Sequence, residues 1–143
     1  MSASFLARLM VTAVAAGQGI APLFIDLNRT HATNPLWPGH ARFHVVWQTM
    51  SLFFLGLVGV ALIWLPLPES RLLFYLATLL TALPMLSFLV AMLSGRAYDG
   101  TLHDANGIQP LRIRIGATVR ECDMNAVLVI AGMAVVLSAA LMF

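Results

Sequence analysis

The chain has 143 residues, of which 60% are hydrophobic and 10% charged, and its formal net charge at pH 7 is +2. Soluble globular domains carry roughly 25% charged residues, so this composition excludes an ordinary soluble domain and indicates an integral membrane protein. The basic residues are all arginines spread along the chain, which does not make a nucleic-acid binding surface. The single cysteine, Cys122, excludes a disulfide within the chain.

Four apolar stretches are each long enough to cross a membrane, since a hydrocarbon core of about 30 Å needs roughly 20 residues of helix. They lie at about residues 5–25, 43–65, 72–93 and 119–143. Together they predict an all-α fold, an integral membrane four-helix bundle, in one transmembrane domain over residues 1–143. The first stretch has an alternative interpretation as a cleaved signal peptide, because Ala13 to Gly17 resembles a cleavage site. Arg8 inside the apolar run favours a span.

Small residues predict where the helices approach each other. In the first stretch, Ala13, Gly17 and Ala21 follow at four-residue spacing and form a stripe on which another helix can pack closely. In the second stretch, Gly56 and Gly59 suit a close approach in the same way.

Two polar connections, at residues 26–42 and 95–117, must lie on the same side of the membrane if there are four spans. That end then receives all four histidines, most arginines and most acidic residues, whereas the opposite end keeps Arg8, Arg71 and Glu69. Two interpretations stay open. The positive-inside rule would place both connections in the cytoplasm, or a functional site gathers polar residues at this end.

The second connection contains an alternating segment, Leu111 to Ile115, which predicts a short hairpin or an extended strip along the membrane surface. Asn106-Gly107 favours a tight turn, and Pro110 opposes a regular ladder. Thr118 to Glu121 has the spacing of a capping box, which predicts that the fourth helix begins there, with Glu121 and Asp123 in its first turns.

A histidine pair marks the start of the second span. Pro38 suits the first turn of a helix, and a helix from there places His40, His44 and Gln48 on one face, with Trp47 beside them. Because a polar stripe in a membrane is costly unless it faces the bundle interior or water, we expect a pocket between helices. Two imidazoles one turn apart can bind one divalent transition metal. The predicted metal ligands are His40, His44 and His31, the other candidates for a third ligand are Asp26, His103, Glu121 and Asp123, and a haem is the second cofactor considered.

The same histidines also suit a proton-transfer site. Asp26 would hold the tautomer of a histidine, and Arg29, its i+3 neighbour, would bind an anionic group of a substrate. A plain ion pair at the lipid head groups is the alternative for Asp26 and Arg29, as is a phosphate contact for Arg42. The predicted catalytic residues are His40, His44, His31, Asp26 and Arg29, and the predicted cofactor-binding residues are Gln48, Trp47 and Arg42.

In size, span number and gathering of polar residues at one end, the chain resembles the small four-helix membrane proteins of the DoxX-like and EXPERA (sterol-isomerase-like) types. This resemblance is one of architecture and implies no residue role. The segment from His40 to Gln48, HARFHVVWQ, is similar to the signature of an uncharacterised bacterial membrane family. The resemblance implies a bacterial inner-membrane location.

These observations predict a small membrane enzyme, an oxidoreductase or isomerase, that acts on a lipid, isoprenoid or quinone-like molecule at a histidine-rich interfacial site. Its chemistry would be metal-assisted or acid/base. The alternative is a non-catalytic accessory subunit of a larger membrane complex that docks a partner, a haem or a pigment. The expected partners are membrane lipids, a lipophilic small molecule, and a homo-oligomer or larger complex, without nucleic acid.

Overall fold

The computed structural model describes residues 2–66, 68, 70–104 and 106–143. Its long helices are α1 (Ala3–Ile25), α2 (Gly39–Trp64), α3 (Ser70–Ser94) and α4 (Met124–Met142). All four are long and apolar enough to span a membrane. The prediction of an all-α four-helix membrane protein is confirmed. A 3-10 helix, η1 (Gly95–Ala97), continues α3, and the strands β1 (Leu111–Ile115) and β2 (Thr118–Cys122) precede α4.

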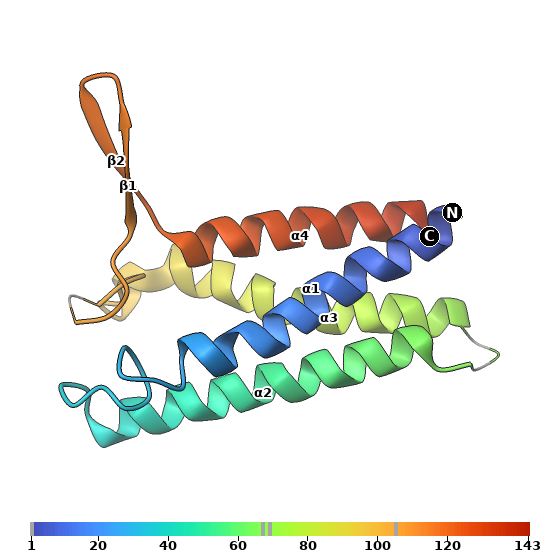
Figure 1. Ribbon diagram of the computed structural model, residues 1–143, viewed down its shortest axis with the longest axis horizontal. Helices are drawn as coiled ribbons and strands as arrows, with labels where there is room; N and C mark the ends of the chain where they lie inside the picture. The colour runs from blue at the N-terminus through green and yellow to red at the C-terminus, as the bar shows by residue number, and fades with distance from the viewer. Residues whose placement is uncertain (1, 67, 69, 105) are drawn as a thin grey trace.

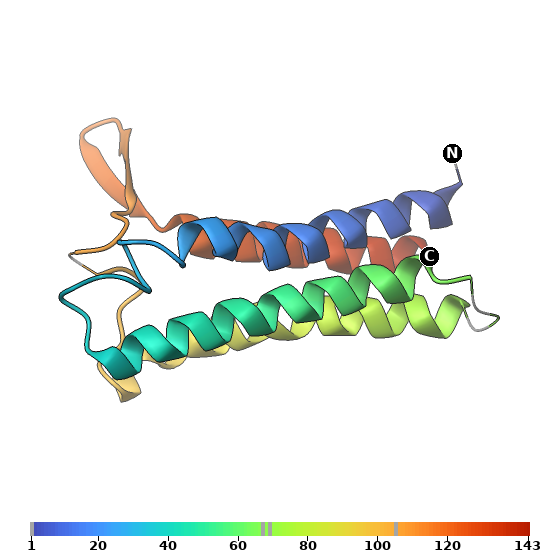
Figure 2. The same ribbon diagram turned by 60° about the horizontal axis from the view of Figure 1, so that its bottom comes forward.

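The helices lie side by side and alternate in direction (Figures 1 and 2). Both chain ends lie at one end of the bundle, together with the connection from α2 to α3. The loop from α1 to α2 and the segment from α3 to α4 lie at the other end, which we call the polar end. The two polar connections therefore share one end, as four spans require. Glu69, expected at the opposite end, lies outside the described residues.

The contact between α1 and α2 fixes how both helices are rotated. At the closest approach, Gly56 faces Ala15 and Gly19, and a Cβ atom built on Gly56 would lie 2.6 Å from the Ala15 carbonyl oxygen. Gly59 also faces Ala15, at the ordinary contact distance of 3.7 Å for such a Cβ atom. The two glycines of α2 thus pack as predicted, because only a residue without a side chain allows the backbones to come this close.

The small-residue stripe predicted for the first helix is on the wrong face. Ala13, Gly17 and Ala21 are exposed, and no atom lies within 4 Å of a Cβ atom built on Gly17. The buried face of α1 consists of Ala7, Val11, Ala15 and Gly19. Both stripes repeat every four residues, so spacing alone does not distinguish them. The close approach of Ala15 and Gly19 to Gly56 of α2 shows that the second stripe is the packed one.

The segment before α4 forms an antiparallel hairpin rather than the start of a helix. Leu111 pairs with Cys122, and Ile115 pairs with Thr118 across the turn, where Gly116 has a φ of 61°. The helix start predicted at Thr118 is therefore wrong. Asp123 caps α4 instead, accepting a hydrogen bond from the Ala126 N–H through Oδ1 at 3.0 Å. A glycine that adopts positive φ closes the hairpin, and the capping-box spacing is incidental.

Candidate functional site

The loop after α1 is a compact cap built around Asn28. The Asn28 side-chain amide donates hydrogen bonds to the carbonyls of Phe24 (2.7 Å) and Ile25 (2.9 Å), two of the carbonyl groups that the helix end leaves without a partner. The Ala32 N–H closes back on the Asp26 carbonyl at 2.9 Å. The cap therefore ends α1 at Ile25 and turns the chain so that His31 returns over the helix end.

Asp26 and His31 lie together in this cap. Asp26 Oδ1 is 3.9 Å from His31 Nδ1, and both side chains are about three-quarters buried, with exposed fractions of 26% and 23%. Thr49 of α2, which is fully buried, donates a long hydrogen bond of 3.5 Å to Asp26 Oδ2. The site thus joins the end of α1 to the third turn of α2. Asp26 and His31 were expected from the sequence as supporting groups beside His40 and His44, and here they lie next to each other.

The Asp26 carboxyl is electrostatically unusual. Burial raises its pKa above the ordinary value, because the charged form loses hydration. The neighbouring His31 and the hydrogen bond from Thr49 lower the pKa, and they offset only part of the increase. A carboxyl held in this way takes up a proton more readily than an exposed aspartate, which suits a group that exchanges protons.

The hydrogen bonds around Thr30 define the tautomer of His31. The Thr30 hydroxyl lies 2.8 Å from Asn28 Oδ1 and 2.8 Å from His31 Nδ1. Since the amide oxygen only accepts, the hydroxyl proton points to Asn28, and Nδ1 of His31 donates to the hydroxyl. Nε2 of the neutral ring is then the acceptor. Trp37 packs edge-on against this ring, with a centroid distance of 5.3 Å.

The cap also touches the second polar connection. Asn34, which is 2% exposed, donates through its amide to the Thr30 carbonyl (3.4 Å) and to the Asn106 carbonyl (3.5 Å). Its Oδ1 accepts from the Leu36 N–H at 3.0 Å. Residues 72 positions apart therefore meet at the polar end, and the buried Asn34 links the two loops. Asn34 is not among the site residues predicted from the sequence.

The second cluster is the histidine pair at the start of α2. His40 and His44 come together, with their Nε2 atoms 3.0 Å apart, but both side chains are exposed. Trp47 and Gln48 are exposed as well, and the Trp47 ring lies 5.7 Å from that of His44. The stripe is thus present, but it is exposed on the outside of the bundle and does not face the bundle interior, where the predicted pocket would have to lie.

The rotation of α2 explains this outcome. Its buried residues are Thr49, Gly56, Gly59 and Ile63. Thr49 follows His40 by nine residues, which at about 100° per residue places the two side chains on opposite sides of the helix. The close approach at Gly56 sets the inner face, so the histidines point outward. A polar stripe at helical spacing identifies a face, but the packing of other residues decides whether that face is inside.

The remaining predicted residues do not join either cluster. Arg29 is exposed and forms no ion pair with Asp26 among the described residues, because the helix ends before them and they do not share a helix face. Arg42 is half-buried, and its Nε atom has no hydrogen-bond partner in the described part of the chain. In residues 2–66, 68, 70–104 and 106–143, no three His, Cys, Asp or Glu side chains gather as a metal site would require. His31 therefore does not complete a metal site with His40 and His44.

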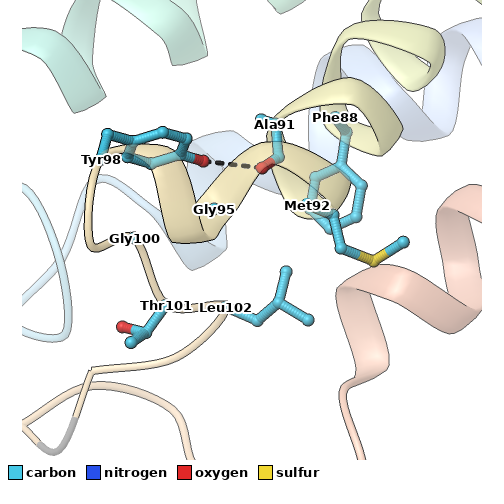
Figure 3. A pocket seen from close by; sticks show the side chains of 8 residues that line it. All are labelled: Phe88, Ala91, Met92, Gly95, Tyr98, Gly100, Thr101 and Leu102. Carbon is cyan, nitrogen blue, oxygen red and sulfur yellow. Dashed lines mark hydrogen bonds between the residues drawn. The ribbon is translucent and has the colours of Figure 1, made fainter.

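A small cavity lies at the polar end beside the last turn of α3 (Figure 3). Its volume is about 180 Å³. The Tyr98 hydroxyl donates a 2.7 Å hydrogen bond to the Ala91 carbonyl, and Gly100 leaves room for the Tyr98 ring, with which a Cβ atom at Gly100 would clash. The cavity is lined by Phe88, Ala91, Met92, Gly95, Tyr98, Gly100, Thr101 and Leu102. None of these residues was predicted as a site residue, although Gly95 and Gly100 on either side of Tyr98 are a signal for a tight loop.

A family model described as a family of unknown function (DUF6640) matches residues 9–136. The match spans every helix at least in part and includes both clusters at the polar end. No curated protein and no solved structure matches the chain. The resemblance to DoxX-like and EXPERA-like proteins therefore has no support beyond architecture, whereas the expected link to an uncharacterised family agrees with this match.

Proposed function

We propose that the chain, which belongs to the family of unknown function DUF6640, is a small membrane enzyme that acts on a lipophilic molecule by acid/base chemistry at its polar end. The observation that carries this proposal is the Asp26–His31 pair. It combines a carboxyl whose pKa is raised by burial with an imidazole 3.9 Å away, at the polar end of the bundle where α1 ends. A carboxyl with a perturbed pKa beside an imidazole is typical of sites that transfer protons.

In this proposal, His31 is the group that accepts a proton from the substrate. Its Nε2 atom is the acceptor of the neutral ring, because Nδ1 donates to Thr30. Asp26 lies on the Nδ1 side, where a carboxylate stabilises the imidazolium formed when Nε2 takes up a proton. Arg29, exposed on the same loop, would attract an anionic group of the substrate. The proton returns to the substrate at another atom, as in an isomerase.

The lipophilic class of substrate follows from where the pair lies. Asp26 follows directly on the membrane-spanning helix α1, so a molecule dissolved in the bilayer can approach from the side. The cavity of Figure 3 offers an apolar recess at the same end, with Phe88, Met92 and Leu102 among its lining residues. An isoprenoid, a quinone or another lipid fits this setting. We propose that the membrane is the inner membrane of a bacterium, the location implied by the resemblance of the segment from His40 to Gln48.

Mass spectrometry of total lipid extracts tests this function. Cells that express the wild-type chain should gain or lose one lipophilic species relative to cells with an empty vector. The species should return to the vector level in Asp26→Asn and His31→Phe variants of equal abundance. Asp99→Asn is the matched control, because Asp99 is an exposed carboxyl at the same end. Identical extracts from vector, wild type and all variants would refute the proposal.

A second function, that of an accessory subunit, is favoured by the exposed histidine pair. Two nitrogens that bind one zinc ion at about 2.0–2.1 Å in tetrahedral geometry lie about 3.3 Å apart, close to the 3.0 Å between the Nε2 atoms of His40 and His44. A metal or haem held there would need its other ligands from a second copy or a partner. Trp47 and Gln48 would lie in the same contact.

Elemental analysis of the purified protein distinguishes the two functions. A subunit that shares a metal across an interface predicts stoichiometric metal, together with an assembly larger than the monomer. Both should be lost in His40→Ala and His44→Ala, and His103→Ala, which changes an exposed loop histidine, should keep them. A metal-free protein whose assembly is unaffected by the two substitutions would exclude this second function and leave the first one open to its own test.

A further inference from the structure

The β1–β2 hairpin is the least covered part of the molecule. Its three apolar residues on β1, Leu111, Ile113 and Ile115, are 53%, 42% and 65% exposed. An isolated two-stranded hairpin is at best marginally stable in water, and exposed apolar rows indicate a contact surface. In Figures 1 and 2 the hairpin extends away from the bundle, so the helices do not provide that contact.

The strand register separates the hairpin into two faces. Residues paired directly across an antiparallel ladder lie on the same face. Ile113 pairs with Arg120, so Arg120 shares the face of the apolar row. Arg112 pairs with Glu121 on the other face, where their side chains form an ion pair of 3.1 Å. The hairpin therefore has an apolar face that carries one arginine, and an opposite face on which charged residues predominate.

The direction of the hairpin places it along the membrane surface. Asp123 is the only residue between β2 and α4, so the hairpin is attached where α4 leaves the membrane. Both views show the hairpin running across the helix axes rather than along them (Figures 1 and 2). Since the helix axes cross the bilayer, a segment transverse to them lies along the membrane surface and reaches over the lipids beside α4.

The charges on the hairpin match the head groups of anionic lipids. Among residues 111–122 there are three arginines and one glutamate. Glu121 pairs with Arg112, and in the described part of the chain Arg114 and Arg120 form no ion pair. An arginine beside an apolar row can extend to a phosphate while its neighbours contact the acyl boundary.

We propose that the hairpin is a lipid-docking surface of this membrane protein. The Leu111, Ile113 and Ile115 row enters the boundary between head groups and acyl chains, and Arg120 binds the phosphate of an anionic lipid. This role is independent of the acid/base function proposed for Asp26 and His31. The bilayer is favoured over a partner protein as the occupant because the hairpin extends sideways from the point where α4 meets the membrane surface.

Spin labels attached in a Cys122→Ser background test the placement of the hairpin. The full chain is reconstituted into vesicles of phosphatidylcholine with or without phosphatidylglycerol, and each variant carries one label, at Ile113→Cys, Ile115→Cys or Arg114→Cys. Labels at 113 and 115 should be accessible to oxygen and protected from a water-soluble nickel chelate, whereas the label at 114 should be accessible to the chelate. Equal accessibility of all three to the chelate would overturn the proposal.

The role of Arg120 is tested with the same vesicles and a fluorescent label at residue 113. Spin-labelled phosphatidylglycerol should quench it more than spin-labelled phosphatidylcholine does, and Arg120→Gln should reduce this preference about fivefold, the effect expected for one arginine at an anionic surface. Arg71→Gln, an exposed arginine at the opposite end, is the matched control and should leave it unchanged. An unaltered preference in Arg120→Gln would overturn lipid docking. So would a label at residue 113 that is buried in native membranes, which contain other proteins, but not in the vesicles.

Discussion

At the scale of single residues, Asp26 couples protonation to folding. In the unfolded chain this carboxyl titrates at its ordinary pKa, whereas burial raises the pKa in the folded protein. Between the two values the folded state binds more protons, so the contribution of Asp26 to stability is fully present below the unfolded pKa and is lost as the pH rises through the folded pKa. The contribution of Asp26 should therefore make the folded chain more stable at mildly acidic than at neutral pH.

The prediction is checked by thermal unfolding in detergent between about pH 4 and about pH 7, a range that begins near the ordinary pKa of aspartate. The wild-type melting temperature should fall with rising pH relative to that of Asp26→Asn, which cannot titrate. Asp99→Asn should show the wild-type slope, because Asp99 is exposed and asparagine tolerates its φ of 53°. Parallel slopes for wild type and Asp26→Asn would show that the carboxyl is not protonated more readily in the folded chain.

Residue types and spacing predict the polar end but only part of its geometry. Asp26 and His31 lie close together because both belong to one short loop between two helices, although the sequence led us to expect them beside His40 and His44. The predicted Asp26–Arg29 pair does not form, since Asn28 binds the last carbonyls of α1 and ends the helix there. His40 and His44 do pair, but facing outward. Their orientation depends on the contact at Gly56, a long-range feature that no local pattern at the histidines reveals.

At the scale of the helices, the contact between α1 and α2 should be sensitive to a single methyl group. Gly56→Ala places a Cβ atom 2.6 Å from the Ala15 carbonyl oxygen, so the two backbones must separate. Overpacking of this kind costs about 1–3 kcal/mol, and the thermal unfolding temperature in detergent should fall. The shift would also move Thr49 relative to Asp26, because both lie along the same pair of helices.

Gly17→Ala is the matched control for this prediction. It introduces the same methyl group in α1 on the exposed face, where no atom lies within 4 Å of the new Cβ atom. No loss of stability is expected. If Gly17→Ala proved as destabilising as Gly56→Ala, the exposed face of α1 would itself be a packing surface, as for a second copy of the chain.

At the same scale, the hairpin shows where local sequence signals compete. Leu111 to Ile115 alternates as a strand, and the capping-box spacing from Thr118 favours a helix. Gly116 with positive φ allows a tight turn, and the ladder then includes Thr118 to Cys122. The helix begins where Asp123 provides a side-chain cap. The pairing of residues 118–122 with the preceding strand overrides the helix start predicted at Thr118.

At the scale of the whole molecule, the uneven distribution of charge predicts an orientation. Arg29, Arg42, Arg96, Arg112, Arg114 and Arg120 all belong to the polar end or its connections, whereas Arg8 and Arg71 lie toward the opposite end. Arg8 is further held within the bundle, where it donates to the Ile63 carbonyl and lies 5.2 Å from the centre of the Phe143 ring. By the positive-inside rule, this distribution predicts that the polar end lies in the cytoplasm.

Cysteine labelling of intact cells measures this orientation in a Cys122→Ser background. Leu36→Cys and Ile108→Cys, both exposed at the polar end, should react with a membrane-impermeant maleimide only after permeabilisation. Leu65→Cys, exposed at the opposite end, should react in intact cells. Labelling of positions 36 and 108 on different sides would contradict the four-span arrangement itself. Labelling of both positions from outside would show that the orientation is reversed. The arginines at the polar end would then not reflect the positive-inside rule, and their role would be in the proposed site and in lipid binding.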